Sequence, residues 1–289
     1  MLEFGFPQEA QVALNEAYAN VFSVAEYSQD YKKILDAYAA DKTQGVAETI
    51  AFCKQVSKET GLNEYTMYAL TLVMMAKISK IHYQKEALPV SVWKDNFMDL
   101  NYKLQECKLV KGVWGIFVPE WFSRFFCVDR FSFGRLQFER VDFGYTYNKN
   151  SVSLTKDSSV INIHIPRTGT GLTPQSVDEA CGQAARFFKE RYAIDPSVFV
   201  CYSWLLYPEN LKVLKPTSNL YSFISRFDIL SAETYQDYTE TWRLFDCEYT
   251  DDLSKLPADT SFRRAYIDWI KKGQKTGYAY GVFIYEPRE

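Results

Sequence analysis

Apolar residues recur every three or four positions through about the first 120 residues, the period of a helix that packs on one side. Gly61 is placed to end one helix as its C′ residue, and Asn63 to cap the next. Strand-type alternation is nearly absent here, so this part is expected to be all-helical. The expected core positions are Val12, Ala13, Tyr18 and Phe22; Ile34, Leu35 and Tyr38; Val46, Ile50, Phe52 and Val56; Met67, Leu70, Met74, Ile78 and Ile81; and Trp93, Phe97, Leu100 and Leu104.

The pattern changes after Pro119, where a short helix over 120–126 is followed by alternation typical of strands. The run 131–143 is predicted to be one strand, with Phe133, Arg135, Gln137 and Glu139 on one face. Alternating strands and helices predict a mixed β-sheet with flanking helices. The further elements expected are a short strand after the polar loop 147–151; strands at 160–165, 198–204, 242–245 and 278–285; and helices at 173–188, 218–227 and 261–271.

Together the two patterns predict an α+β protein with an all-helical domain over 1–127 and a mixed-sheet domain over 128–289. The chain has 289 residues, of which 47% are hydrophobic and 24% charged, so each part has enough apolar residues for a packed core. The net charge is −3 and no basic run occurs, so no nucleic-acid partner is expected.

Six scattered cysteines form no CxxC pair and have no histidine at ligand spacing, so neither a metal site nor a disulfide framework is expected. The most apolar stretch, Met67–Ile78, is shorter than the ~20 residues that cross a bilayer, and the start of the chain lacks the pattern of a signal peptide. The expected setting is cytoplasmic, without membrane association.

A strand, a glycine-rich loop and a helix follow one another over Val160–Pro166, Arg167–Gly171 and Thr173–Glu190. Thr173 as N-cap and Pro174 as the first helical residue mark the helix start. Glycines allow close backbone approach, and unpaired amides at a helix N-terminus favour phosphate. The loop is therefore either an anion site or a plain turn. It matches neither a Walker loop nor GxGxxG.

Several blocks, in order, resemble the C-terminal domain of bacterial GNAT-like acyltransferases. The helical half likewise resembles the N-terminal domain that precedes it in such proteins. The blocks cover roughly 132–245 and read Gly134-Arg-Leu-Gln-Phe-Glu139, Ile163-His-Ile-Pro166, Arg186-Phe-Phe188, Cys201-Tyr-Ser-Trp-Leu-Leu206 and Ser218-Asn-Leu220 through Phe223.

The resemblance implies that acetyl-CoA or another acyl-CoA binds where two parallel strands separate, with no metal. Its pyrophosphate would lie on Arg167, Gly169, Thr170 and Gly171. The family loop reads Gln/Arg-x-x-Gly-x-Gly/Ala, and Arg-x-Gly-x-Gly here is one residue shorter. The reaction implied is acyl transfer to an amine of a small molecule or peptide.

The chemistry requires a base for the amine proton and often an acid for the leaving thiolate. Glu139 is the candidate base, unless its strand face is only a solvent-facing surface. His164 is a second base or a substrate contact, or a structural histidine. Tyr221 is the candidate acid, a role also open to Tyr202. The candidate substrate-binding residues are Arg135, Gln137, Tyr202 and Ser203.

Two alternatives remain at this level. A binding or regulatory protein would keep the fold without CoA chemistry, as the shortened loop suggests. A hydrolase or other transferase would use His164 and Ser203, although Ser203 lies in Tyr-Ser-Trp and not in a Gly-x-Ser-x-Gly elbow.

Overall fold

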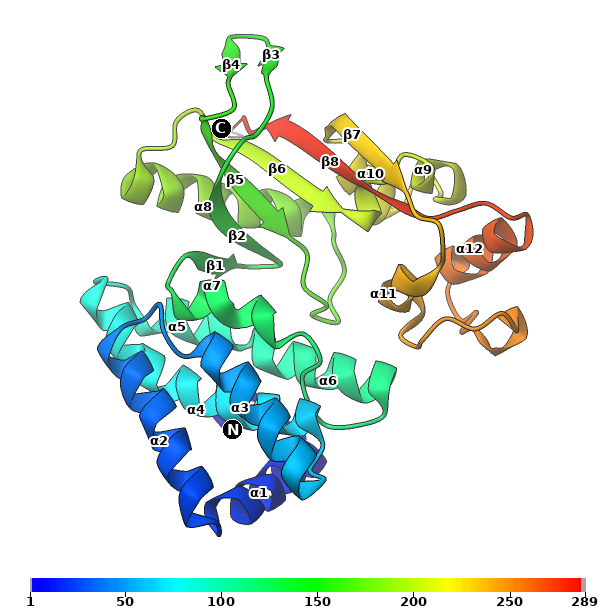
Figure 1. The fold of residues 1–289 in the computed structure, drawn as a ribbon. Coiled ribbons are helices and arrows are strands. Elements are labelled where there is room, and N and C mark those ends of the chain that lie inside the picture. Colours follow the sequence, from blue (N-terminus) through cyan, green and yellow to red (C-terminus); the bar gives the residue numbers. More distant parts are fainter. Residues whose placement is uncertain (1, 287–289) are drawn as a thin grey trace. The chain divides into compact units, whose positions relative to one another are not determined.

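The computed structural model describes residues 2–286 and divides the chain into two compact units, which meet between Phe131 and Ser132. The first unit is helical and the second is built around a β-sheet, as the two sequence patterns predict (Figure 1). Each unit has its own core and is described separately below.

Helix α4 is the centre of the first unit, because it packs against α1, α2, α3, α5 and α6. Its residues from Met67 to Val73 are all buried, as expected for a helix surrounded by others. The helices are α1 (Gln8–Phe22), α2 (Ala25–Ala40), α3 (Val46–Thr60), α4 (Glu64–Lys85), α5 (Val90–Phe97), α6 (Asp99–Lys111) and α7 (Ser123–Phe126), with 3-10 turns η1 (Leu2–Phe4) and η2 (Pro119–Phe122).

The predicted helix ends at Gly61 and Asn63 are confirmed. The helical stretch predicted after Pro89 is two helices, α5 and α6. Ile81, a predicted core residue, is exposed, and the buried face of α1 is not the predicted one. The Asn63 side chain accepts hydrogen bonds from two amides at the start of α4, and Gly61 ends α3 in the left-handed conformation. In α1 the buried stripe is Ala10, Leu14, Ala17 and Val21, and Val12 and Tyr18 are exposed. Both stripes have helical spacing, so only the packing partners decide between them.

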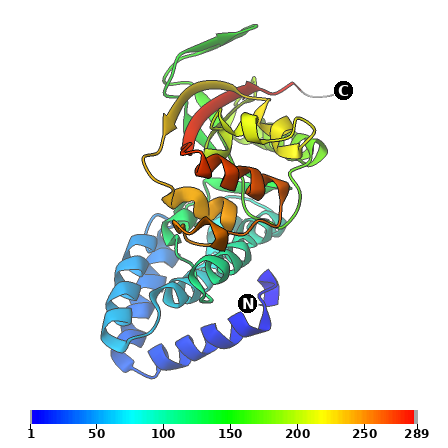
Figure 2. The same cartoon turned by 90° about the vertical axis from the view of Figure 1, so that its right-hand side faces the viewer.

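The second unit contains a six-stranded sheet in the order β1-β2-β5-β6-β8-β7 (Figure 1). Strands β5 and β6 are parallel, and the pairs β2–β5, β6–β8 and β7–β8 are antiparallel. The sheet strands are β1 (Arg130–Phe133), β2 (Leu136–Asp142), β5 (Ser159–His164), β6 (Val198–Ser203), β7 (Asp228–Thr234) and β8 (Gly277–Ile284); β3 (Tyr147–Lys149) and β4 (Val152–Leu154) form a separate hairpin, seen at the top of Figure 2.

The two faces of this sheet have different neighbours. One face carries Phe138, Phe199 and Phe283, whose rings contact each other, and Phe283 also meets Phe227 after α10. This face packs against α8 and α10 and is called the helix face below. The helical segments here are α8 (Pro174–Tyr192), η3 (Trp204–Leu206), α9 (Asn210–Val213), α10 (Asn219–Ile224), η4 (Thr239–Thr241), α11 (Trp242–Phe245), η5 (Leu253–Lys255) and α12 (Ser261–Lys271).

The opposite face is apolar where Val160, Val198, Val200 and Val282 pack with residues of the β3–β4 hairpin. Towards the carboxyl ends of β5 and β6 this face becomes polar and aromatic. It is called the open face below, and it carries four of the predicted site residues: Gln137, Glu139, His164 and Tyr202.

Two strand predictions for this unit are wrong, one strand was missed, and the predicted polar loop 147–151 contains strand β3. The run 131–143 is not one strand: it turns at Gly134, whose φ is +54°, so Arg135 lies in a turn and does not share a strand face with Gln137 and Glu139. Residues Trp242–Phe245 form the helix α11, because Leu244 and Phe245 pack against α12. Strand β7 was not expected. It is an edge strand in which no residue is fully buried, so its sequence does not show the apolar alternation of an interior strand.

The pairing of β7 with β8 depends on a glycine at the start of β8. A Cβ added at Gly277 would lie 2.2 Å from the Glu233 carbonyl oxygen and 2.5 Å from the Tyr207 ring. We expect Gly277→Ala to lower the free energy of unfolding by about 2 kcal/mol or more, measured by urea denaturation, because the strands must separate to admit the methyl group. Gly171→Ala is the control and should leave stability nearly unchanged, because the atom nearest to its added Cβ is 3.8 Å away. An equal loss of stability in the two variants would contradict this account.

Candidate functional site

A cluster of polar side chains lies on the open face where β2 pairs with β5. The register places Gln137 opposite His164 and Glu139 opposite Asn162, so all four side chains point to the same face. His164 Nε2 lies 2.7 Å from Glu139 Oε1. Asn162 Nδ2 lies 3.2 Å from the same carboxylate oxygen and 3.1 Å from His164 Nε2. The two candidate bases are therefore in direct contact.

The shortest of these contacts decides the hydrogen-bond directions. One ring nitrogen cannot both donate and accept, so Nε2 of His164 donates to Glu139 at 2.7 Å. The Asn162 amide then donates to the same oxygen and only abuts the imidazole. The side chains of Glu139 and His164 are 8% and 18% exposed, so the interaction is largely shielded from water. A carboxylate in this position orients the imidazole and stabilises its protonated form.

Gln137 is also buried on this face. It is 2% exposed, and its Oε1 is buried without a hydrogen-bond partner in the described chain. Since buried polar atoms are normally satisfied, this amide oxygen is available to a bound group. Glu139 is likewise not the solvent-facing carboxylate that its strand pattern also allowed.

Next to this cluster, the parallel strands β5 and β6 separate. They pair only at Ile161 with Phe199 and at Asn162 with Val200. Beyond these two pairs β6 continues to pair with β8 as far as Ser203, and β5 with β2 as far as His164. The facing backbone edges of β5 and β6 are therefore unpaired towards their carboxyl ends, and Figure 1 shows the two strands diverging there.

The loop after β5 is held open by Arg135. Its guanidinium donates to the Pro166 carbonyl at 2.6 Å and to the Thr170 carbonyl at 3.0 Å. Gly169 has a φ of +77°, which favours glycine. The amides of Gly169, Gly171 and Gln175 make no hydrogen bond within residues 2–286. Thr173 caps α8 through its side chain, as predicted, so the loop leads directly into a helix N-terminus.

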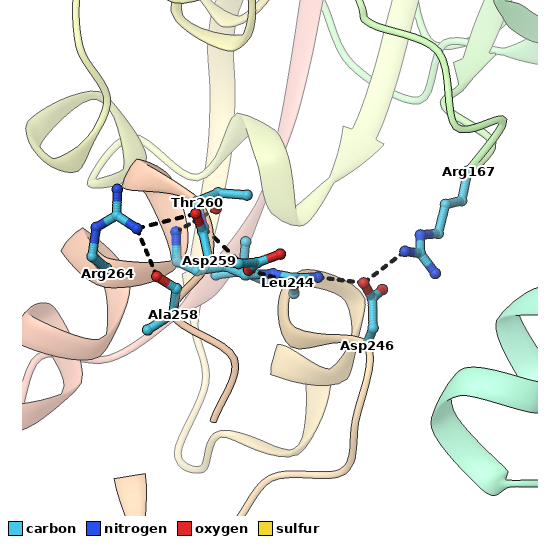
Figure 3. A network of polar contacts seen from close by, with 8 residues as sticks. Arg167, Leu244, Asp246, Ala258, Asp259, Thr260 and Arg264 are labelled. Atoms are coloured by element: carbon cyan, nitrogen blue, oxygen red, sulfur yellow. Dashed lines mark hydrogen bonds and ion pairs between the residues drawn. The ribbon is translucent and has the colours of Figure 1, made fainter. Parts of the chain in front are cut away.

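Arg167, the charged residue of this loop, pairs with Asp246 after α11, with 2.6 Å between Nη2 and Oδ2 (Figure 3). The same carboxylate oxygen accepts from Arg263 of α12. Arg263 also donates to the Leu244 carbonyl at 2.8 Å and pairs with Asp259 at 2.9 Å. The phosphate-binding candidate is therefore tied to the α11–α12 segment, 79 residues further along the chain.

Comparison with known families decides the identity of both units. An N-acyltransferase N-terminal domain matches residues 1–128, and a GNAT-like C-terminal domain matches residues 131–283. The chain belongs to the GNAT-like N-acyltransferases. By its two domains the chain is classed with the acyl-CoA-dependent N-acyltransferases, and its acceptor is not specified. No curated protein sequence matches the chain.

Solved acyltransferase structures share the fold at low sequence identity. A mutant acyltransferase in complex with octanoyl-CoA is 19% identical, with a TM-score of 0.68 over 79% of this chain and 69% of its own. An acyltransferase in complex with decanoyl-CoA and teicoplanin is 17% identical, with a TM-score of 0.68 over 83% of this chain and 76% of its own. The mixed sheet and helical arrangement are thus those of known acyltransferases.

The GNAT-like unit also contains a groove on its helix face, between α8 and α10. A cavity of about 910 Å³ is lined there by both helices and by the end of β8. Arg226, which lines the groove, pairs with Asp178 and donates to the Pro174 carbonyl at 3.4 Å, and the part of α8 that lines the groove runs from Asp178 to Arg186. Tyr221 lines this groove and is not brought together with Glu139 and His164.

Two neighbouring candidates, Tyr202 and Ser203, lie on opposite faces of β6. Tyr202 pairs with Tyr280 on the open face and is 55% exposed. The hydroxyl of Ser203 accepts from the Leu205 amide at 3.2 Å and caps η3. Ser203 and His164 therefore lie on opposite faces of the sheet, whereas a nucleophile and its base would lie side by side.

Sequence reasoning missed Asn162 and Asp246. Asn162 was detectable, because it alternates with His164 among β-branched residues in the same strand. Asp246 carries no local signal, since its partner Arg167 is distant in sequence. Within residues 2–286 no group of three His, Cys, Asp or Glu side chains is placed to hold a metal, and no helix there is long and apolar enough to span a membrane.

The Arg167–Asp246 pair competes with any phosphate for the guanidinium. We expect Asp246→Asn, which suits the left-handed backbone at this position, to strengthen CoA binding about two- to fivefold in calorimetry, the range for a half-exposed ion pair. Asp259→Asn removes a partner of Arg263 but none of Arg167 and is the control. Weaker CoA binding by Asp246→Asn would mean that Asp246 instead positions Arg167 for the phosphate.

Proposed function

We propose that the Glu139–His164 pair is the base with which this enzyme transfers an acyl group from acyl-CoA to an amine of a small molecule or peptide. The observation that carries this proposal is the 2.7 Å contact between the two side chains, largely buried beside the separated ends of β5 and β6. A thioester placed between the strands would have its carbonyl carbon within reach of an amine on the open face.

The reaction balances within these groups. The amine nitrogen attacks the thioester carbonyl, its proton passes to the Glu139–His164 pair, and the carbon–sulfur bond breaks as the amide forms. The leaving thiolate then takes that proton, which releases CoA as a thiol and restores the pair. Unpaired backbone amides along β5 and β6 would stabilise the negative charge that develops on the carbonyl oxygen.

The co-substrate would enter from the helix face. The pyrophosphate would lie on Arg167, Gly169, Thr170 and Gly171, where the amides of Gly169 and Gly171 make no hydrogen bond within residues 2–286 and the loop leads into α8. The nucleotide would occupy the groove between α8 and α10, whose volume is within the ~300–1,000 Å³ typical of ligand pockets. The pantetheine arm would pair with the unpaired strand edges as an added strand does.

Structural relatives guide the choice of substrates to test. Those relatives were solved with octanoyl-CoA, decanoyl-CoA or CoA, and in two cases also with teicoplanin or 10C-teicoplanin. We therefore propose that acyl chains of eight to ten carbons be tested beside acetyl. Free thiol release from acetyl-, octanoyl- and decanoyl-CoA against an amine library identifies both substrates.

Glu139→Gln and His164→Ala should each lower kcat about 10²- to 10⁴-fold, because general base catalysis contributes this much. Thiol-release assays measure the decrease in kcat, and thermal melting checks that each variant folds. Glu190→Gln, an exposed carboxylate on α8, is the matched control. Full activity in both variants would rule out the proposed base. Ser203→Ala should retain activity, and its inactivity would favour the nucleophilic alternative.

A non-catalytic binding protein remains the second candidate, favoured by the shortened loop and by the attachment of Arg167 to Asp246. Calorimetry with CoA and octanoyl-CoA separates the two. Binding followed by thiol release supports the enzyme. Binding of both ligands without turnover of any amine tested, or no binding at millimolar ligand, would support the alternative.

A further inference from the structure

The open face of the sheet carries a group of four tyrosines beside the separated strands, called the tyrosine shelf here: Tyr145, Tyr202, Tyr278 and Tyr280. Tyr202 stacks on Tyr278 with ring centroids 5.1 Å apart, and Tyr145 stacks on Tyr280 at 4.9 Å. The hydroxyl of Tyr145 lies 2.9 Å from that of Ser231 on β7, and Tyr280 donates to the Phe143 carbonyl. The shelf is thus fixed at several points.

Two of the shelf tyrosines are more exposed to solvent than the other large hydrophobic residues described in the second unit. Tyr202 is 55% and Tyr145 37% exposed, and they are the only exposed large hydrophobic residues among the described residues of this unit. The Tyr202 hydroxyl makes no hydrogen bond within residues 2–286. Exposed rings that gather on one face and are already oriented by stacking are typical of a ligand-binding surface.

The shelf borders the reacting groups. Val200 lies opposite Asn162, which contacts both Glu139 and His164. Tyr202 is two residues beyond Val200 on the same face, just as His164 is two residues beyond Asn162. Tyr202 and His164 therefore flank the opening between β5 and β6 from its two sides.

The charges near the shelf leave a net negative charge. Arg243, which acts on Tyr278, pairs with Glu240 at 2.9 Å, and Glu233 has no ion-pair partner within residues 2–286. Glu233 lies opposite Tyr278 on β7 and is exposed. Burial, and then the negative charge of Glu233, raise the pKa of the Tyr202 phenol, so this carboxylate acts directly on the shelf. Tyrosine faces attract ammonium groups as well as rings. A carboxylate repels phosphate, and the proposed CoA site lies on the other face.

We infer that the tyrosine shelf binds the acceptor, and that the acceptor is an amine carrying an aromatic ring. This inference rests on the proposed acyltransferase function and adds the substrate class. The ring would stack on Tyr202 while Glu233 attracts the ammonium form in solution. The amine would then lie between the shelf and the Glu139–His164 pair, which takes its proton.

The test compares 2-phenylethylamine with hexylamine, which has no ring, using octanoyl-CoA and thiol release. Wild-type KM should be lower for the ring-bearing amine. Tyr202→Ala should raise that KM about two- to tenfold, the range for one aromatic contact, with kcat and the KM of hexylamine unchanged. Tyr202→Phe should restore it. Tyr18→Ala, which removes a similarly exposed and stacked tyrosine from the first unit, is the control.

Calorimetric binding of both amines to each variant makes the test independent of turnover. Preferred binding of 2-phenylethylamine that Tyr202→Ala abolishes supports the shelf even where turnover is absent, and absent turnover then counts against the proposed function alone. Equal KM and affinity for the two amines in the wild type would overturn the shelf. So would a Tyr202→Ala effect on the KM of octanoyl-CoA instead of the amine.

Discussion

The arrangement of the proposed site in the second unit depends on one constraint: the parallel strands β5 and β6 stop pairing after only two residue pairs. Strands β5 and β6 share two residue pairs, at Ile161–Phe199 and Asn162–Val200, and then each continues with only its antiparallel neighbour. The strands remain in one sheet through these two pairs, and Val160 of β5 packs with Val198 and Val200 of β6 in one core cluster. Backbone groups that would form hydrogen bonds in a continuous sheet are left unpaired. A ligand can form hydrogen bonds with them, and the proposed site residues lie around this opening.

Each proposed part of the reaction has a position relative to that opening. The glycine-rich loop and the first turn of α8 follow directly from β5, so any phosphate bound there lies close to the end of that strand. The Glu139–His164 pair is formed across β2 and β5 on the open face, and Tyr202 stands at the matching position of β6. In the proposed arrangement the sheet would separate a phosphate-binding side from an acceptor side, and the thioester would pass between them.

The α11–α12 segment has a role in the same arrangement. Asp246 adopts a left-handed backbone conformation, which is uncommon for a residue with a side chain, and accepts from both Arg167 and Arg263. Because Arg263 is largely buried and Arg167 is more exposed, the weaker of the two links is the one to the loop. This segment is therefore connected to the proposed phosphate site through the ion pair between Asp246 and Arg167.

The sequence alone determined the features that local chemistry governs. Asn63, Gly61, Thr173 and Pro174 set helix ends through their own backbone preferences and hydrogen bonds, and the apolar runs of β5 and β6 predicted both strands. The order of short motifs identified the family. Tertiary structure decided the contact of Glu139 with His164, because it requires one particular register between two strands. It also decided the partner of Arg167 and the edge strand β7, since distant pairing and weak burial leave no periodic trace in the sequence.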